Sequence, residues 1–425
     1  MARQVYDLSH FTIQLGKIGR LQTLSRIPVI AGDSIRLQAA GVWKMSPLRR
    51  DLILDSKVDL FAFFVPHRHI YGDRWLDFIR QGNDESQTFP VHSTGARANP
   101  FLACNERGVL PMWIPAGYNR IWNRYFRPPT DDSAIRADDR LPNSFLSDDN
   151  LFGIKCGWLP RLFTATVDDE TGTSDETVDL DGSRLSLLKL AQAKAHLRTE
   201  REREFFSQRY IDVMDHTWGT TVNIDADQRP GLCWRSSFWL SGYDIDGTAG
   251  DSLGQYSGKS MALGGMRMPS KFFNEHGCLW IMALVRFPTI FAEEKHYLDG
   301  KANFSYKELA ADPEILRNEP PMTINANDFF EPGGDNNVGK RAYGDWYREH
   351  QSFVHRRFDS LHGFPFSSIF DSGITKDDLR FVDSEHYDEI FQTTQQGHYR
   401  AQLRMDVMAK RYVPKPQASI FAGAS

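Results

Sequence analysis

The sequence predicts a mainly β protein, an antiparallel sandwich of the jelly-roll type with long loops inserted between its strands. Aromatic residues are abundant, with 29 Phe, 14 Tyr and 10 Trp among 425 residues, and 32 Gly and 21 Pro favour turns. Strand-like patterns gather in three stretches, at about 20–66, 218–290 and 385–413. Because the first and last of these stretches must share one sheet, a closed sandwich is the architecture that we expect.

The first stretch contains clear strand signals. The segment "IPVIAGDSIRLQAAGVWKM" predicts two strands that are joined by a turn at Gly32–Asp33. The segment "DLILDSKVDLFAFFVPHRH" alternates at first and then becomes wholly apolar. A continuous apolar run of this length is typical of a strand that is buried on both faces.

Two long insertions are expected within a single domain that spans residues 1–425, at about 86–217 and 293–384. The first insertion includes residues 168–181, which hold seven acids and no base and are interpreted as an exposed loop. Residues 183–219 carry the one strong helix signal of the chain, with Ser183 as a candidate N-cap.

Strand signals return after the first insertion. The segments "RPGLCWRSSFWLSGYDIDG" and "GCLWIMALVRFPTIF" are rich in aromatic residues and bounded by Gly or Pro. The segment "YRAQLRMDVMAKRYVP" alternates, and it predicts two faces of opposite character. We expect one face to hold Ala401, Leu403, Met405, Val407 and Ala409, and the other to hold Gln402, Arg404, Asp406, Met408 and Lys410.

Charge is distributed unevenly along the chain. The formal net charge is −5, yet residues 1–50 carry eight bases against two acids, and residues 396–425 carry five bases against one acid. The middle of the chain is therefore acidic. Basic ends with interleaved aromatic residues are compatible with binding of single-stranded nucleic acid, and ordinary solvated charge is the alternative.

Membrane insertion and disulfide formation are not expected. No apolar run approaches the roughly 18 residues that a bilayer span needs, and the N-terminus lacks the apolar segment of a signal peptide. We therefore expect a soluble chain that is made in the cytoplasm. The four cysteines are far apart and form no CxxC pair, so reduced thiols are expected.

His67 and His69 raise the question of a metal site, because residues two apart share a face on a strand. With Asp73 and a third histidine, either His276 or His386, they would resemble the metal centre of a cupin, a jelly-roll enzyme. Neither His276 nor His386 lies between the glycine and proline residues that the cupin motif needs around its later histidine. We therefore interpret the pair as structural, at a turn into a short helix, and keep a metal-dependent enzyme as the alternative.

Other catalytic motifs are absent or out of place. The sequence contains no GxSxG, no GxxxxGK[ST] and no HExxH motif. The segment "YDIDGTAGDSLGQYSG" at 243–258 is similar to the DxDGT motif of some phosphatases. Because it lies between β-rich segments and contains repeated glycines, we interpret it as a surface turn.

Several long stretches resemble the major capsid proteins of the microviruses, the phiX174-like phages with single-stranded DNA. The stretches are "YDLSHF", "GKIGRL", "PVIAGDS", "SPLRRDLILDSKVDLFAFFVPHRHIYGDRW", "SGYDIDGT", "SLGQYSG", "EHGCLWIMALVRFP" and "GFPF". The likeness extends over nearly the whole chain. It implies an eight-stranded jelly roll and a structural protein rather than an enzyme.

The resemblance also implies an assembly and a set of partners. The chain would form pentamers and then a T=1 icosahedral shell, assembled in the host bacterial cytoplasm, around a circular single-stranded DNA genome. Its partners would be the spike protein, the internal and external scaffolding proteins, a small basic DNA-packaging protein, the pilot protein and host lipopolysaccharide. A bound calcium ion is implied as well, without ligands that can be carried over to this sequence.

Five bases near the two ends of the chain are the candidates for facing DNA inside such a shell. They are Arg20, Arg26, Arg404, Lys410 and Arg411. A monomeric module that binds single-stranded nucleic acid would use the same residue types, so it remains a third hypothesis beside the shell protein and the metalloenzyme.

Overall fold

The structure is a computed structural model of the whole chain. The residues described here are 3–48, 55–72, 74–75, 91–93, 109–127, 153–156, 230–243, 259–287, 298, 305–319, 322–325, 337–341, 343–348, 387–388, 391 and 397–413.

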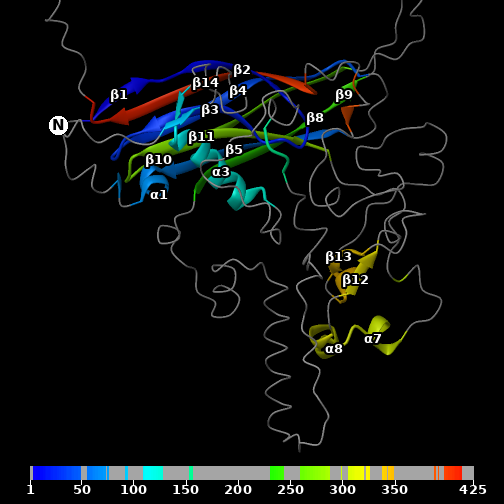
Figure 1. The fold of residues 1–425 in the computed structure, drawn as a ribbon. Helices are drawn as coiled ribbons and strands as arrows, with labels where there is room; N and C mark the ends of the chain where they lie inside the picture. Colours follow the sequence, from blue (N-terminus) through cyan, green and yellow to red (C-terminus); the bar gives the residue numbers. More distant parts are fainter. Residues whose placement is uncertain are drawn as a thin grey trace, which may run out of the picture.

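Two antiparallel sheets form the centre of the molecule (Figure 1). The first, which we name the β14 sheet, has the order β1-β14-β4-β10-β9, and β2 also pairs with β14. Its strands are β1 (Gln4–Asp7), β2 (His10–Gly16), β4 (Ser34–Met45), β9 (Gly242–Tyr243), β10 (Lys259–Phe272) and β14 (Tyr399–Arg411). The second, the β11 sheet, has the order β3-β11-β5-β8. Its strands are β3 (Gln22–Val29), β5 (Ser56–Pro66), β8 (Gly231–Leu240) and β11 (Gly277–Arg286).

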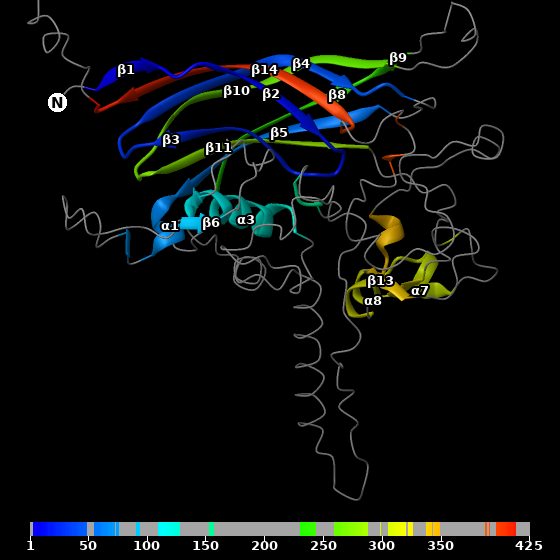
Figure 2. The same ribbon diagram turned by 45° about the horizontal axis from the view of Figure 1, so that its top comes forward.

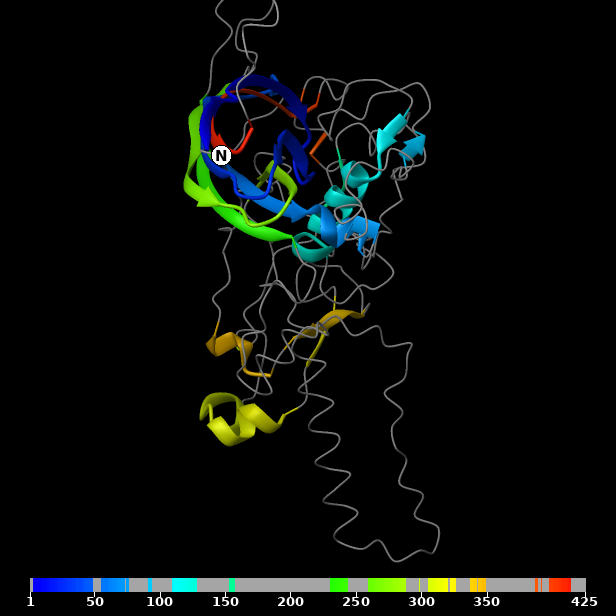
Figure 3. The same cartoon turned by 90° about the vertical axis from the view of Figure 1, so that its left-hand side faces the viewer.

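The strand order is that of a jelly roll. Strands β1 and β2 pair with successive parts of β14, so they act as one interrupted strand. The long strands are then β2-β14-β4-β10 in one sheet and β3-β11-β5-β8 in the other. Along the chain they change sheet at each step except from β5 to β8. Figure 3 views this sandwich from its end, where the strands surround a common centre. We infer eight principal strands from this order.

Alternating apolar residues build the core between the two sheets. The predicted faces of the last strand are confirmed, because inward-facing residues such as Leu403 and Met405 are buried and the residues between them are exposed or half-buried. The predicted turn between β3 and β4 is also confirmed, with Gly32 in the left-handed region at φ +89°. Apolar side chains of both sheets meet in one buried cluster, which includes Trp43, Leu279 and Tyr399.

The central strands β5 and β11 of the β11 sheet are buried on both faces, as the apolar run of β5 predicts, whereas several residues of the edge strand β8 are exposed. Helix α3 (Trp113–Tyr125) lies against the side that faces away from the sandwich core (Figure 2). Its Tyr118 and Ile121 pack in a second apolar cluster with Phe63 and Trp280. The Oη of Tyr118 also donates a hydrogen bond to the Leu21 carbonyl at 2.8 Å. This helix lies in a segment that the sequence predicts to be irregular.

Some strands of the structure were not predicted, and some predicted segments lie outside the described residues. Strands β1 and β2 precede the first predicted stretch, and β10 is a strand that the sequence did not single out. The predicted helix at 183–219, the acidic segment 168–181 and most of 243–258 lie outside the described residues. The remaining described elements are short: α1 (His67–Tyr71), β6 (Val91–Ser93), β7 (Val109–Pro111), α7 (Tyr306–Leu309), α8 (Pro313–Asn318), β12 (Met322–Asn325), β13 (Asn337–Arg341) and the 3-10 helix η6 (Asp345–Tyr347).

A buried polar cluster joins the end of β2 to the start of β14. Lys17 Nζ lies 3.3 Å from Asp388 Oδ2, and His398 Nε2 lies 2.5 Å from Asp388 Oδ1. The Ile18 amide donates to His398 Nδ1, so the neutral ring carries its proton on Nε2 and donates it to Asp388. Burial lowers the pKa of His398. The cluster therefore ties the end of β2 to residues 388–398, which are more than 370 residues further along the chain.

Candidate nucleic-acid interface

The β14 sheet turns one face away from the sandwich core, and we name this the outer sheet face. It is formed by every second residue of β1, β2, β14, β4 and β10, and the strand register sets these residues side by side. In one row, Leu15 pairs with Arg400, which pairs with Lys44. No described helix covers this face in Figures 1 and 2.

The outer sheet face is basic. Six exposed bases lie on it, against two acids, Asp7 and Asp406. The bases are Arg36, Lys44, Arg267, Arg400, Arg404 and Lys410. An excess of bases on one open face attracts a polyanion, and the phosphates along a nucleic-acid chain are one such ligand.

Large apolar side chains share this face with the bases. Phe11 is 77% exposed, Ile13 is 72% exposed and Leu263 is 78% exposed. The Arg404 guanidinium lies 5.8 Å from the centre of the Phe11 ring. Bases beside exposed apolar and aromatic groups suit a partner with charged and flat apolar parts, such as a single nucleic-acid strand, and they also suit contacts between proteins.

Two of the five predicted DNA-facing bases lie on this surface. Arg404 and Lys410 are exposed on β14, and Arg404 Nε pairs with Asp406 Oδ1 at 2.7 Å. Their exposure is the feature that the prediction needs, and contact with DNA stays a prediction. Arg36 and Lys44 are two further bases of this face that are not among the five candidates, and the alternation of β4 is the signal that identifies them.

The other three predicted bases are turned to internal contacts, and the reason differs for each. Arg20 is 1% exposed and donates from Nη1 to the Gly153 carbonyl at 3.1 Å. Arg411 pairs with the buried Asp33 at 2.7 Å. Arg26 is half-buried between the rings of Trp113 and Trp280, at 5.5 and 5.6 Å. We therefore leave Arg20, Arg26 and Arg411 out of the candidate interface.

The two histidines at the end of β5 lie in helix α1, where residues two apart do not share a face. The His67 amide donates to the His276 carbonyl at 3.0 Å, and its ring packs between Trp75 and Trp113. Burial, with a smaller contribution from the charge of His276, lowers the pKa of His67 to about 4. With this pKa, the ring of His67 is neutral at pH 6–7.

His69 is buried, and its Nε2 lies 3.4 Å from Nη2 of Arg68. Arg68 itself makes a paired contact with Glu275, at 2.9 and 3.0 Å. Asp73 and His386 lie outside the described residues. The described part of the chain brings no three His, Cys, Asp or Glu side chains together in a way that could hold a metal ion. The structural role of the two histidines stays a prediction.

The described cysteines are free thiols. Cys278 is buried, and burial raises its pKa to about 12; burial also raises the pKa of Cys156. Such thiols remain protonated and unreactive at neutral pH. Cys104 lies outside the described residues. Among the described residues, no helix is long and apolar enough to cross a bilayer.

Comparisons with known proteins decide the family. The family described as "Capsid protein (F protein)" matches residues 1–183 and 174–421 of the chain. Capsid protein F of Escherichia phage G4 is 39% identical over 421 residues, which cover 98% of this chain and 97% of that protein. The chain belongs to the capsid protein F family. The F proteins of Escherichia phage alpha3 and Enterobacteria phage phiK are each 38% identical, again over 98% of this chain and 97% of theirs.

Membership of the F family fixes the class of function. The chain is a structural capsid protein and a component of a phage virion, and it is not an enzyme. The alternative of a metal-dependent cupin-like enzyme is therefore wrong.

Proposed function

We propose that this F-family chain assembles through pentamers into a T=1 icosahedral shell that encloses a circular single-stranded DNA genome. The outer sheet face supports the DNA contact, since it carries six bases against two acids on one open surface. On this proposal the outer sheet face lines the interior of the shell. Of the five candidate bases, Arg404 and Lys410 would meet phosphates there.

The partners of the assembly are also proposals. By the family resemblance, they are the spike protein, the internal and external scaffolding proteins, the small basic DNA-packaging protein, the pilot protein and host lipopolysaccharide. Exposed apolar groups outside the outer sheet face, such as Trp239 at 53% and Tyr306 at 69% exposure, are surfaces that such contacts would cover. Assembly would take place in the host bacterial cytoplasm.

Calcium is the one cofactor that the resemblance implies. Carboxylate and carbonyl oxygens are the ligands that this ion prefers. The described residues bring together no group of three His, Cys, Asp or Glu side chains that could hold the ion, and calcium stays an implication of the resemblance. The acidic segment 168–181 lies outside the described residues, and we assign it no role.

The proposal is tested by co-expressing the chain with its neighbouring phage genes and measuring the sedimentation of the product. We expect a particle of megadalton size that protects single-stranded DNA from nuclease, and a pentamer when the scaffolding genes are left out. A monomer in both conditions would contradict the proposed assembly and favour the single-strand-binding module. Particles that form but never protect DNA would contradict the proposed DNA contact.

A further inference from the structure

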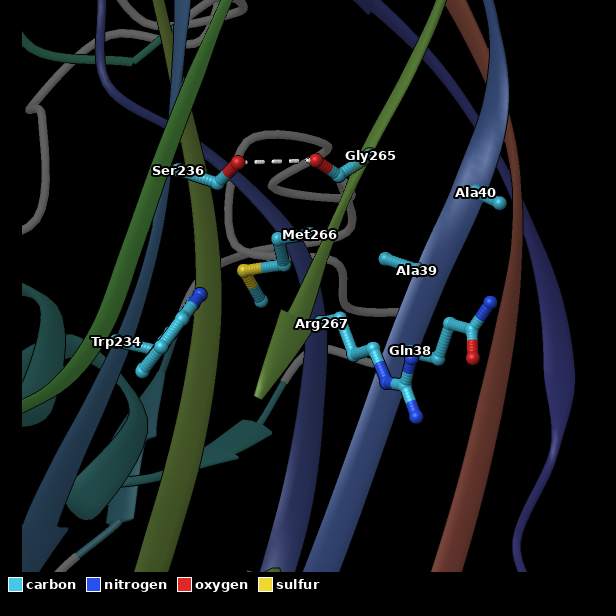
Figure 4. Close-up of a pocket in the computed structure, with 8 residues that line it drawn as sticks. All are labelled: Gln38, Ala39, Ala40, Trp234, Ser236, Gly265, Met266 and Arg267. Carbon is cyan, nitrogen blue, oxygen red and sulfur yellow. Dashed lines mark hydrogen bonds between the residues drawn. The ribbon is translucent and has the colours of Figure 1, made fainter. Parts of the chain in front are cut away.

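A shallow hollow opens where strand β8 of the β11 sheet meets strand β10 of the β14 sheet. Its volume is about 460 Å³, which is within the usual range of ligand pockets. Figure 4 shows Trp234 on one side, Gln38 and Arg267 on the other, and Met266 between them. The hollow therefore continues the outer sheet face to the edge of the sandwich.

Backbone packing keeps this hollow open. Gly265 lies so close to β4 that a Cβ atom at this position would collide with the Ala39 carbonyl. Position 265 therefore cannot carry a side chain without a shift of the backbone. The Ser236 hydroxyl donates to the Gly265 carbonyl at 3.1 Å, and this bond fixes β8 beside β10. At Gly265, the lining of the hollow is therefore backbone rather than side chain.

The side chains around the hollow offer three different contacts. Trp234 is 39% exposed and presents an aromatic surface at the edge of β8. Arg267 is exposed, and it stands directly opposite the exposed Gln38 across the β4–β10 pair. None of the described residues that line the hollow is acidic. The acid next to Gln38 on β14 is Asp406, and its charge is paired with Arg404.

We propose that the hollow binds one unpaired nucleotide of a single-stranded nucleic acid. The base stacks on Trp234, the Gln38 amide forms hydrogen bonds with the edge of the base, and Arg267 receives a flanking phosphate. The neighbouring phosphates then lead onto the basic outer sheet face. Aromatic, amide and guanidinium groups without an acid match a nucleotide better than an apolar peptide. This inference rests on the proposed DNA contact and gives it a defined base-binding position.

The test compares two fluorescein-labelled probes on the purified full-length protein. One is a ten-nucleotide oligo(dT), and the other is an abasic strand of the same length and charge. The wild type is expected to bind oligo(dT) more tightly. Trp234→Ala should weaken oligo(dT) binding by roughly 5- to 150-fold and leave the abasic probe nearly unaffected, because only a base can stack.

Two further variants provide controls. Trp239 is also exposed on β8, at 53%, but it lies beside Lys57 and does not line the hollow. Trp239→Ala should therefore bind both probes like the wild type. Trp234→Phe keeps an aromatic ring and should retain most of the preference for oligo(dT) over the abasic probe. If Trp234→Ala does not fold, loss of this preference in Trp234→Phe would contradict stacking at position 234.

Three results would overturn the inference: equal affinity of the wild type for both probes, wild-type binding by Trp234→Ala, or an equal loss with Trp239→Ala. Ultraviolet cross-linking in filled particles then separates this inference from the proposed function. A cross-link between DNA and the β8 peptide that contains Trp234 is expected. Particles that contain DNA but give no such cross-link would contradict the nucleotide site without contradicting the proposed shell. Particles without DNA would contradict the proposed function itself.

Discussion

At the scale of single residues, two ion pairs of equal length have very different surroundings. Arg411 and Asp33 are separated by 2.7 Å, and their side chains are 10% and 0% exposed. Arg404 and Asp406 are also separated by 2.7 Å, but they are 63% and 45% exposed. Water screens the second pair, while the first pair has almost no contact with water. Burial rather than distance decides what each pair contributes.

Arg411→Ala is therefore expected to destabilise the chain strongly. It removes the partner of a buried carboxylate, and an uncompensated buried charge costs about 3–5 kcal/mol of unfolding free energy. Arg404→Ala breaks an exposed pair of the same length and should cost about 0–1 kcal/mol. Urea unfolding of the two variants measures the difference. Equal losses for the two variants would show that burial does not control these pairs.

Acid should destabilise the chain through His67. Its pKa in the folded chain is about 4, below the ordinary value of 6.5, so the folded state binds its proton less readily than the unfolded state. The chain should therefore lose unfolding free energy as the pH falls from about 6.5 towards 4. Between pH 7 and 8 both states are neutral at this residue, and no change is expected.

The variant His67→Gln should lose less stability over the acid range than the wild type does. Urea unfolding midpoints at pH 7.5, 5.5 and 4.5 measure this difference. His10→Gln is a suitable comparison, because His10 is a half-buried histidine on β2. If His67→Gln and the wild type respond to acid in the same way, His67 does not carry the acid sensitivity.

At the scale of elements, hydrophobic patterns predicted the strands in which they are uninterrupted. Elements whose patterns are interrupted by Gly or Pro were not predicted. Strands β4, β5, β11 and β14 have uninterrupted patterns. Strand β10 contains Gly264, Gly265 and Pro269, all of which usually weaken a strand. Helix α3 buries Ile114, Tyr118, Ile121 and Trp122 at helical spacing, but Pro115 and Gly117 conceal that pattern. Packing against the β11 sheet overrides these weak local preferences.

The close approach of β10 to β4 gives a prediction at this scale. A side chain at Gly265 would collide with the Ala39 carbonyl, so Gly265→Ala must push two central strands apart. We expect a loss of about 1–3 kcal/mol, or failure to fold. At Gly231 the nearest atom would be 3.9 Å from the new Cβ, so Gly231→Ala should be tolerated. Thermal unfolding of both variants compares the two, and a stable Gly265→Ala protein would contradict this account.

At the scale of the whole molecule, the sequence predicted that a basic surface exists, but it identified only some of the bases that form it. Alternation placed Arg404 and Lys410 outward, and the same alternation points Arg411 inward, to Asp33. For Arg20, the deciding contact is the carbonyl of Gly153, which is 133 residues away. Such a distant partner leaves no mark in the local pattern. Charge counts along the chain therefore predict that a basic surface exists, and the fold decides which bases form it.

The salt dependence of DNA binding tests this surface. Each phosphate contact with a single strand contributes about 0.7 to the slope of log affinity against log salt concentration. Replacing both Arg400 and Arg404 by Gln should therefore reduce the slope for a long oligo(dT) by about 1.4. The affinity at low salt should fall as well, because fewer cations are released on binding.

A matched pair of bases outside the outer sheet face serves as the control. Lys307 and Arg348 are each 52% exposed and lie outside the sandwich, beside Glu319 and Asp345. Replacing both by Gln changes the net charge by the same amount, yet it should leave the slope nearly unchanged. If both double variants lower the slope equally, the effect belongs to net charge rather than to a surface. If only Arg400 and Arg404 matter, DNA is bound where the exposed sides of β2, β14, β4 and β10 meet.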